Sequence, residues 1–369
     1  MMKIGKFTDF YRDVTKDGTK IPQEKYLQSG RYPVIDQGRQ AIAGRWDSND
    51  GIFEKVPAII FGDHTRAIKY IEEPFFIGAD GVKILRPVNS QDNPKYLYYA
   101  LQAARLPDLG YSRHFKAVKE LEIRVYSIEE QNEIVHILEK IDHLIEQRHT
   151  EIGCLDQLVK SRFIELFGSL NSNEKGLDIV SIEELCTLIK DGTHQTPTYT
   201  DDKENGFKFL SSKDVMTQKI CWDEIKYIPA ELHEKLYATI QPMRNDILMS
   251  KNGVNYGVAA VNDTDEVFDI YVSLALLRPI TDRVNPVYLR CAINNPDTKR
   301  QFDSSIKGIG VPNLHLGEIK KTKVLLPPMS KQNEFVAFVE HTDKSKLAIQ
   351  QSLDKLELLK KSLMQKYFG

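Results

Sequence analysis

Polar side chains that could bind the edges of base pairs occur in short segments of the first third of the chain. Arginine suits guanine, asparagine and glutamine suit adenine, and lysine, serine and threonine suit phosphate oxygens. Glycine residues punctuate these segments, which favours loops around short strands. The side chains expected to contact DNA here are Gln37, Arg39, Arg45, His64, Thr65, Arg66, Lys69, Arg113 and Lys116.

A second set of polar clusters lies in the second half of the chain. Most of them combine hydroxyl or amide groups with a lysine or histidine. Any one of these side chains could equally belong to a solvated loop, so the interpretation depends on the clusters taken together. The expected DNA contacts are Thr193, His194, Gln195, Thr196, Ser211, Ser212, Lys213, Ser250, Lys251, Asn252, Asn255, Tyr256 and Lys307.

The segment Asp63-His64-Thr65-Arg66 allows three interpretations. An Asp–His pair could perform acid–base catalysis. An acceptor, a donor and a guanidinium together suit a loop that reads bases, which is the interpretation we favour. The third is a turn whose Asp and His bond to the local backbone. His114 and His315 share a place in an internal repeat, and we expect them to fix a strand-to-helix junction, with phosphate contact as the alternative.

Enzyme motifs are missing from the sequence. It contains no G-x-x-x-x-G-K-[ST] phosphate loop and no N-P-P-[YF] sequence of the kind that holds a target base in amino-methyltransferases. No acidic pair with a following E-x-K suits a metal nuclease. The four cysteines are scattered and form no C-x-x-C pair, so a zinc site is not indicated. We therefore expect a non-catalytic protein with no cofactor and no metal.

Two copies of one long element stand 201 residues apart and must position these clusters. The first begins at Ile128 with IEEQNEIVHILEKID, and the second begins at Met329 with MSKQNEFVAFVEHTD. The triplet Gln131-Asn132-Glu133 falls on Gln332-Asn333-Glu334 without a gap. Such a match over ~40 residues indicates a tandem repeat.

Both copies have the apolar spacing of a coiled-coil helix, sustained over about five heptads. The first opens with Ser127 and Glu130, a capping box. Its residues 128–168 carry net charge −5, whereas residues 327–369 carry +2, which favours pairing of the two helices with each other. The seam and subunit-interface residues are expected to include Ile134, Leu138, Ile141, Ile145, Leu155, Phe335, Val339 and Leu356.

The remaining segments are rich in short apolar runs separated by Gly, Asn, Asp and Pro turns, which predicts strand-rich mixed domains. The expected fold is α+β, with two mixed α/β domains and two long helices in a pseudo-two-fold internal repeat. The expected boundaries are 1–127 for the first domain, 128–168 for the first helix, 169–176 for a linker, 177–326 for the second domain and 327–369 for the second helix.

This plan resembles the specificity subunit of Type I restriction–modification enzymes. The paired QNE…D…S…FG helices and GIGVPNLHLGEIKKTKVLLPP (308–328) carry the resemblance, as do YPVIDQGRQAIAGRWD (32–47), IIFGDHTRAIKY (59–70), DGTHQTP (191–197), GFKFLSSKDV (206–215) and DILMSKNGVNYG (246–257). The resemblance implies two target-recognition domains that each read half of a bipartite double-stranded DNA sequence. It also implies an antiparallel coiled coil that docks two adenine-N6 methyltransferase subunits, joined in some complexes by motor-nuclease subunits.

Composition narrows the alternatives. A protein that neutralises DNA phosphates alone should have a large positive net charge, whereas this chain has a net charge of −2. Partner subunits are therefore expected to supply much of the binding to phosphates. A stand-alone tandem repressor or architectural protein, the main alternative, should be more basic. A coiled-coil interaction protein without nucleic acid would leave the two polar, loop-rich domains unexplained. The N-terminus lacks the apolar run of a signal peptide and no stretch suits a membrane span, so we expect a cytoplasmic location without a membrane.

Overall fold

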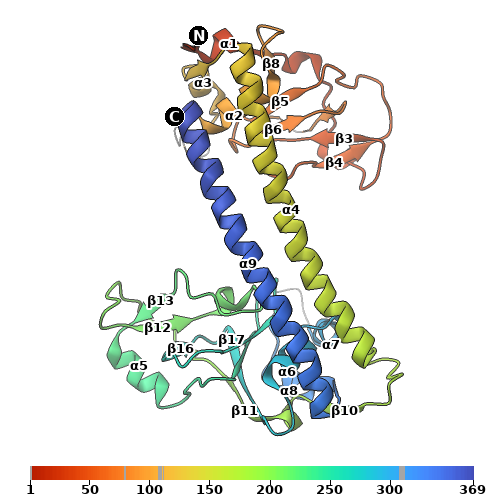
Figure 1. Cartoon of the computed structure of the whole chain (residues 1–369), viewed down its shortest axis with the longest axis vertical. Coiled ribbons are helices and arrows are strands. Elements are labelled where there is room, and N and C mark those ends of the chain that lie inside the picture. Colours follow the sequence, from red (N-terminus) through yellow and green to blue (C-terminus); the bar gives the residue numbers. More distant parts are fainter. Residues whose placement is uncertain (1, 79, 107–109, 111, 307–311) are drawn as a thin grey trace. The chain divides into compact units, whose positions relative to one another are not determined.

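The computed structural model describes residues 2–78, 80–106, 110, 112–306 and 312–369. The chain forms two compact units, which we describe one at a time. The first unit contains Met1–Glu151 and Ile349–Gly369, and the second contains Ile152–Ala348. The long helices α4 (Ile128–Phe167) and α9 (Met329–Phe368) contribute residues to both units (Figure 1).

Among its described residues the first unit contains three small sheets and the helices α1 to α3, together with parts of α4 and α9. A four-stranded sheet has the order β2-β8-β5-β6, a three-stranded sheet has the order β4-β3-β7, and β1 pairs with β9. Its elements before α4 are β1 (Lys3–Lys6), α1 (Phe7–Phe10), β2 (Tyr11–Asp13), β3 (Tyr32–Ile35), β4 (Gly44–Trp46), β5 (Ala58–Gly62), β6 (Ile68–Ile71), β7 (Phe76–Ile77), β8 (Val82–Pro87), α2 (Pro94–Ala103), α3 (Phe115–Val118) and β9 (Glu122–Val125).

The second unit repeats this set of sheets. Its four-stranded sheet has the order β11-β17-β14-β15, its three-stranded sheet has the order β13-β12-β16, and β10 pairs with β18. Its elements before α9 are β10 (Asp178–Ser181), β11 (Cys186–Asp191), β12 (Phe207–Leu210), β13 (Lys226–Ile228), α5 (Ala230–Tyr237), β14 (Ile247–Ser250), β15 (Ala259–Val261), β16 (Phe268–Ile270), β17 (Leu274–Pro279), α6 (Pro286–Ile293), α7 (Pro296–Ser305), α8 (Leu316–Lys321) and β18 (Lys323–Leu326).

The two units share strand connectivity as well as strand number. In each three-stranded sheet the middle strand has one antiparallel and one parallel neighbour: β3 pairs antiparallel with β4 and parallel with β7, and β12 does the same with β13 and β16. In each four-stranded sheet an inner strand forms a hairpin with the edge strand, β5 with β6 and β14 with β15. The internal repeat therefore includes the domains, although only the helices and the segments just before them match in sequence.

Local signals explain where the helices begin and end. The backbone N–H and hydroxyl of Ser127 donate to Glu130 Oε2 at 3.0 and 2.8 Å, which is the predicted capping box. Asn93 and Asn285 cap α2 and α6 with their side-chain oxygens, and proline follows each of them. Gly168 follows α4 with φ of 73°, a conformation that a residue with a Cβ rarely adopts.

Helices α4 and α9 contact each other within each unit. In the first unit Lys360 of α9 lies 2.5 Å from Asp142 of α4, and in the second Lys346 of α9 pairs with Asp156 of α4. Within the second unit Arg162 of α4 also lies 3.5 Å from Glu334 of α9, so rising residue numbers on α4 meet falling numbers on α9 there. Both lysines come from the basic helix and both aspartates from the acidic one, as the charge difference predicts. The α+β repeat with two paired long helices is confirmed.

The predicted seam residues form part of the core of each unit. Ile134 and Leu138 pack in the first unit's core, and Phe335 and Val339 pack in the second's, beside Phe163 and Tyr288. Ile141 is also buried, whereas Ile145, Leu155 and Leu356 are half-buried. These side chains join elements of one chain, so most of this set has little surface left for a second subunit. Their assignment to a subunit interface stays a prediction.

Candidate nucleic-acid interface

Many of the predicted contact residues fall at three equivalent places in the two units. The segment after β3 carries Gln37 and Arg39, and the segment after its counterpart β12 carries Ser212 and Lys213. The β5–β6 hairpin and its counterpart β14–β15 carry the next groups. The third place is the approach to α3 or α8, with Arg113 in the first unit. Clusters that are far apart in the sequence thus belong to one loop group in each unit.

Gln37 holds the first unit's loop group together. Its side-chain amide donates to Asp80 O at 3.0 Å, and its side-chain oxygen accepts from His64 N at 3.2 Å. The Thr65 hydroxyl donates to the backbone oxygen of Gln37. Both ends of this amide are therefore engaged inside the protein, so Gln37 braces the β5–β6 loop instead of offering a free amide to a base.

Asp63 connects the same hairpin to α3. It is 4% exposed, and its carboxylate accepts from the backbone N–H of Phe115 at 2.8 Å. Its carbonyl accepts from His114 N at 2.8 Å. A buried carboxylate that caps a helix is in no position to act on a substrate. Of the three interpretations of this segment, the structure supports the turn for Asp63 and gives no support to acid–base catalysis by it.

The two repeated histidines have different surroundings. His114 is 1% exposed, and its ring Nδ1 lies 3.0 Å from Asp63 O, which supports the predicted structural role at the junction. His315 precedes α8 at the matching position but is exposed. The structural role predicted for both histidines therefore fits only the first, whereas the ring of His315 is open to solvent at its loop.

In the first unit the predicted contact residues divide into exposed side chains and side chains buried inside the loops. Arg39, Thr65, Arg113 and Lys116 are exposed, and Arg66 is half-buried with φ of 59°. Lys69, by contrast, is 9% exposed and donates to Asp36 O at 2.9 Å. Burial lowers the pKa of Lys69 although Asp36 opposes this effect. In this structure Lys69 therefore braces the loop through Asp36, and its ammonium is turned into the protein.

Arg45 also has an internal partner. It lies on β4, half-buried, and its Nη1 donates to Gly30 O at 3.2 Å. This bond uses one of its five N–H donors, so the side chain braces the loop around Gly30 and keeps other donors for a further acceptor.

In the second unit Lys251 and Ser250 are structural. Lys251 is 5% exposed, and its ammonium pairs with Asp191, which also lies 3.6 Å from His194 Nε2. Ser250 is fully buried, and its hydroxyl donates to Asn255 O at 2.8 Å. In this structure both side chains organise the β14–β15 loop from within, so the structure gives no support to a direct DNA contact by either of them.

The remaining predicted residues of the second unit divide in the same way. Ser211 caps a short helical turn through Asp214, and the Tyr256 hydroxyl donates to Asp303 at 2.5 Å. Thr193, Ser212 and Asn252 are half-buried. Lys307 lies outside the described residues. The side chains that project into solvent are His194, Gln195, Thr196, Lys213 and Asn255.

Ser273 joins two of these loops, although no sequence pattern singles it out. Its hydroxyl accepts from Ser212 N at 3.0 Å, and its carbonyl accepts from Lys251 N at 2.9 Å. It thus joins the loop after β12 to the β14–β15 loop. Nearby, Gly253 N donates to Pro312 O at 3.1 Å, which ties the hairpin to the approach to α8. Ser273 precedes a buried strand, and no local pattern reveals that it bridges two distant loops.

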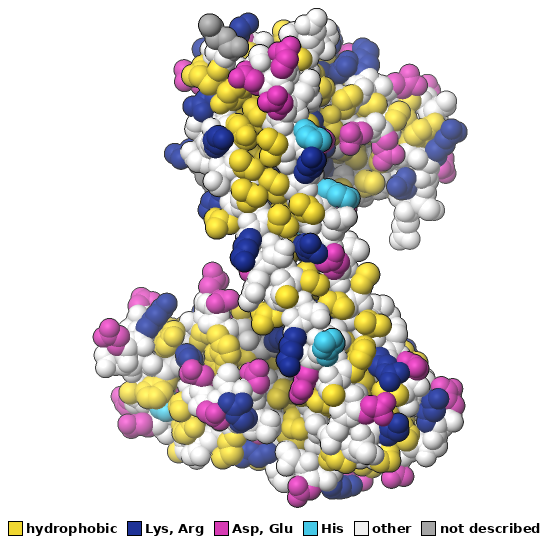
Figure 2. All heavy atoms as spheres, in the orientation of Figure 1, with side chains coloured by type: hydrophobic (Ala, Val, Ile, Leu, Met, Phe, Trp, Pro, Cys, Tyr) yellow, Lys and Arg dark blue, Asp and Glu magenta, His cyan; other side chains and the backbone are white. Residues whose placement is uncertain are grey.

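The mixture of charges on the surface does not suit a protein that binds DNA mainly by neutralising its phosphates. Figure 2 shows Lys and Arg side chains interspersed with Asp and Glu on the visible face, without one extended basic area. No group of three His, Cys, Asp or Glu residues within the described ranges could hold a metal ion. Among the same residues, no helix is long and apolar enough to cross a membrane.

Comparison with known proteins agrees with this geometry. Residues 2–153 and 174–359 match the family model of the Type I restriction modification DNA specificity domain. The Type I restriction enzyme MjaVIII specificity subunit of Methanocaldococcus jannaschii is 22% identical over 397 residues, covering 99% of this chain and 90% of that protein. The S subunit of a Type I restriction–modification system from M. genitalium superposes with a TM-score of 0.59 at 16% identity, covering 100% and 96% of the two chains. A chain from a study of complex assembly in the type I system gives 0.52 at 16% identity, covering 100% and 97%. The two family matches together span most of the sequence, so the chain belongs to the family of Type I restriction–modification specificity subunits, the non-catalytic subunits that recognise the DNA target.

Proposed function

We propose that this subunit reads a bipartite DNA target, with one half-site for the loop group of each unit. Residues 1–127 and 177–326 would be the two target-recognition domains, with 169–176 as a linker. The observation that carries the proposal is the shared strand connectivity of the two units. One framework presents two groups of loops, and the exposed side chains of those groups differ in chemistry.

The difference in chemistry predicts two unlike half-sites. The first loop group offers arginines at positions 39 and 113, which suit guanine or phosphate. The second offers His194, Gln195 and Asn255, and glutamine and asparagine suit adenine. A duplicated framework with identical loops would read a symmetric sequence, whereas these loops favour an asymmetric one.

We further propose that two adenine-N6 methyltransferase subunits dock on the helices, and that a motor-nuclease subunit joins some complexes. Apolar side chains on the outer faces of the helices support a partner surface (Figure 2). Ile137 and Leu144, 38% and 37% exposed, stand seven residues apart on α4 in the first unit. In the second unit Leu158 and Leu347 are 48% and 59% exposed. Family membership and the small net charge both disfavour a stand-alone repressor.

The test is to map the methylated sequence produced by complexes that carry single substitutions. Arg39→Ala should relax or weaken the first half-site only, and Asn255→Ala the second only, since a lost base contact costs ~1–3 kcal/mol. Lys55→Ala and Arg244→Ala are matched controls. Each removes an exposed cation that precedes β5 or β14, at the end of the strand away from the loop group.

A target in which each substitution degrades both halves equally would refute the assignment of one half-site to each unit. A uniform loss over all sequences would instead identify phosphate contacts. The control variants should methylate the wild-type sequence at the wild-type rate.

A further inference from the structure

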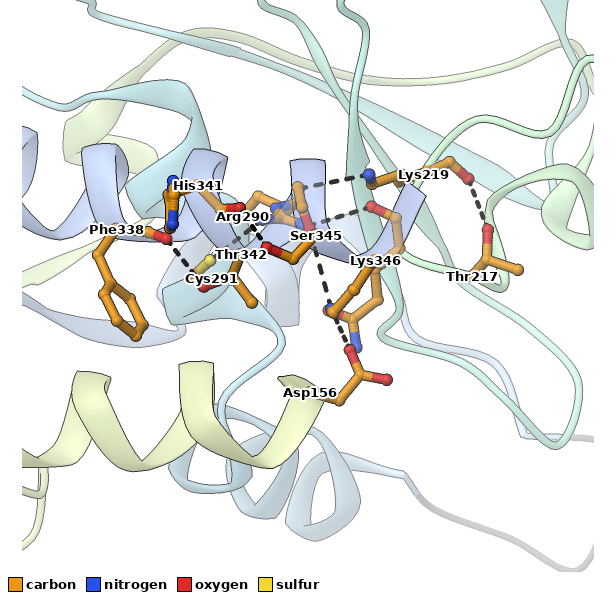
Figure 3. Close-up of polar contacts among 12 residues, drawn as sticks. Asp156, Thr217, Lys219, Arg290, Cys291, Phe338, His341, Thr342, Ser345 and Lys346 are labelled. Carbon is orange, nitrogen blue, oxygen red and sulfur yellow. Dashed lines mark hydrogen bonds and ion pairs between the residues drawn. The ribbon is translucent and has the colours of Figure 1, made fainter. Parts of the chain in front are cut away.

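A cavity of about 110 Å³ lies inside the second unit, where α4, α6 and α9 meet. Its walls include Asp156 and Lys160 from α4, Arg290 and Cys291 from α6, and Asp343 and Lys346 from α9. Figure 3 shows most of these side chains around the α9 helix. The cavity is separate from the loop groups proposed to read DNA, and the recognition role leaves it unexplained.

Arg290 is the unusual side chain in this wall. It is 8% exposed, yet none of the ion pairs found within the described ranges involves it. Its Nη1 donates to Gln218 O at 3.3 Å and its Nη2 to Cys291 Sγ at 3.3 Å, whereas its buried Nε has no hydrogen-bond partner. A guanidinium has five donors in a fork that matches carboxylate or phosphate. Leaving one buried without an anion is costly.

The neighbouring charges do not supply that anion. Lys346 pairs with Asp156 and lies 3.8 Å from Asp343, and Lys219 lies 3.4 Å from Asp343 (Figure 3). Two carboxylates are therefore matched by two ammonium groups. Arg290 and the exposed Lys160 remain as cations of the wall, and neither has an ion pair among the described residues. A negatively charged group that enters the cavity would meet two uncompensated positive charges.

In the first unit a larger side chain stands at the position that corresponds to Cys291. Tyr96 of α2 corresponds to Tyr288 of α6, because both hydroxyls donate at 2.8 Å to the backbone of the last strand, at Arg124 and Leu325. Tyr99 therefore corresponds to Cys291. The Tyr99 hydroxyl donates to Asp142 at 2.7 Å, and Asp142 is the repeat partner of Asp343. The second unit has a small thiol in place of a large ring.

We propose that this cavity binds one small oxyanion of the phosphate class, with Arg290 as its buried donor and Lys160 at its mouth. The bound anion would connect α6 to both long helices and so stabilise the second unit. Its size suits a single tetrahedral oxyanion, and the walls enclose Arg290 too closely for a duplex to reach it. The occupant is therefore free phosphate or sulfate and not the DNA backbone.

The experiment measures binding and thermal unfolding of the full chain with inorganic phosphate, against chloride at equal ionic strength. Wild type should bind one phosphate per chain by equilibrium dialysis. Its unfolding temperature should rise saturably, by roughly 5 °C at a hundredfold excess over Kd. Arg290→Met should lose both responses and, in chloride, should be at least as stable as wild type because it removes a buried unpaired cation.

Two further variants serve as controls in case Arg290→Met misfolds. Cys291→Tyr keeps the arginine but refills the cavity as in the first unit, and should also lose phosphate binding. Arg244→Met removes an exposed arginine that pairs with Asp265, and should bind phosphate like wild type. Equal phosphate binding by wild type and Cys291→Tyr would overturn the proposal, as would a chloride effect as large as that of phosphate. A short duplex that displaces the phosphate would assign the cavity to a DNA phosphate and would also overturn it.

Discussion

The Gln-Asn pair that is repeated near the start of each long helix, Gln131-Asn132 and Gln332-Asn333, should hold that helix against the domain before it. Its contribution to the free energy of unfolding can be measured. Gln131 is fully buried and makes three hydrogen bonds. Its Nε2 donates to Asp92 Oδ1 and to Tyr126 O, both at 3.0 Å, and its Oε1 accepts from Asn93 N at 2.8 Å. Asn93 also caps α2 and donates to Asn132 at 2.9 Å. One glutamine thus fixes the start of α2 against the start of α4.

The second repeat has the same arrangement. Gln332 Oε1 accepts from Asn285 N at 2.8 Å, and its Nε2 donates to Pro327 O at 2.8 Å and to Arg283 O at 3.2 Å. Asn285 Nδ2 donates to Asn333 at 3.1 Å. The one chemical difference is that a carboxylate, Asp92, accepts in the first unit where a backbone carbonyl accepts in the second.

Truncation of either glutamine should be costly. Gln131→Ala removes one partner each from the Asn93 N–H, the Tyr126 carbonyl and the Asp92 carboxylate. Each unsatisfied group costs ~1–3 kcal/mol, and water that enters the gap recovers part of this. We expect a loss of about 2–4 kcal/mol in the free energy of unfolding. In urea the midpoint should fall by roughly 1–2 M. Gln332→Ala should cost a similar amount, and Gln147→Ala, at an exposed site on α4, less than ~0.5 kcal/mol.

The glutamate variants distinguish a clamp from simple packing. Glu keeps the acceptor for the backbone N–H but loses the two donated bonds. At position 131 it also faces the Asp92 carboxylate, so Gln131→Glu should destabilise more than Gln332→Glu at pH 7. If Gln131→Ala unfolds at the same urea concentration as Gln147→Ala, the hydrogen-bond reasoning is wrong. If the two glutamate variants are equal, the role assigned to Asp92 is wrong.

Two further predictions concern ion pairs and pH. Asp246 is 1% exposed and accepts from Arg278 Nε and Nη2, each at 2.8 Å, so Asp246→Asn should lower the free energy of unfolding in urea by about 3–5 kcal/mol. Asp265 forms a similar but exposed pair with Arg244, so Asp265→Asn should lower it far less. Equal losses would contradict the argument from burial. The hydroxyl and the backbone N–H of Ser181 donate to Glu184 and lower its pKa to about 2, so Ser181→Ala, which removes only the hydroxyl, should raise that pKa part of the way to its usual value. Because the folded-state pKa is depressed, the stability difference from wild type should be complete above about pH 4.5 and should shrink as the pH falls through about 2. A difference that stays constant between about pH 4.5 and about pH 2 would refute this prediction.

The helices and strands could be predicted because their signals are local. The capping box at Ser127, the apolar spacing of α4 and α9, and the Asn-Pro starts of α2 and α6 each act within a few residues. The short apolar runs of the two domains include the buried strands β5 and β14 for the same reason. The opposite charges of the two helices also predicted a pairing that Lys360 and Asp142 show directly.

The site was predicted less well, because residue type does not show which way a side chain points. Lys69 and Lys251 looked like phosphate contacts, yet both lie inside their units beside an aspartate that is distant in sequence. Asp36 and Asp191 lie 33 and 60 residues away from these lysines, so no spacing rule connects them. Ser273 was missed because a serine that bridges two loops looks like any serine before a strand.

The same structure explains how two loop groups can differ while their supports stay alike. The bonds that position each group use backbone atoms or buried side chains: Asp63 with Phe115 N and Gln37 with His64 N in one unit, and Ser273 with Ser212 N in the other. Exposed positions such as Arg39 and Asn255 lie outside this support. Substitution there changes what a loop can read at little cost in stability, because surface changes seldom exceed ~0.5 kcal/mol. Under the proposed function, recognition specificity and folding stability would depend on different residues of the same loops, and a new target sequence would require no change to the strands or the helix clamp.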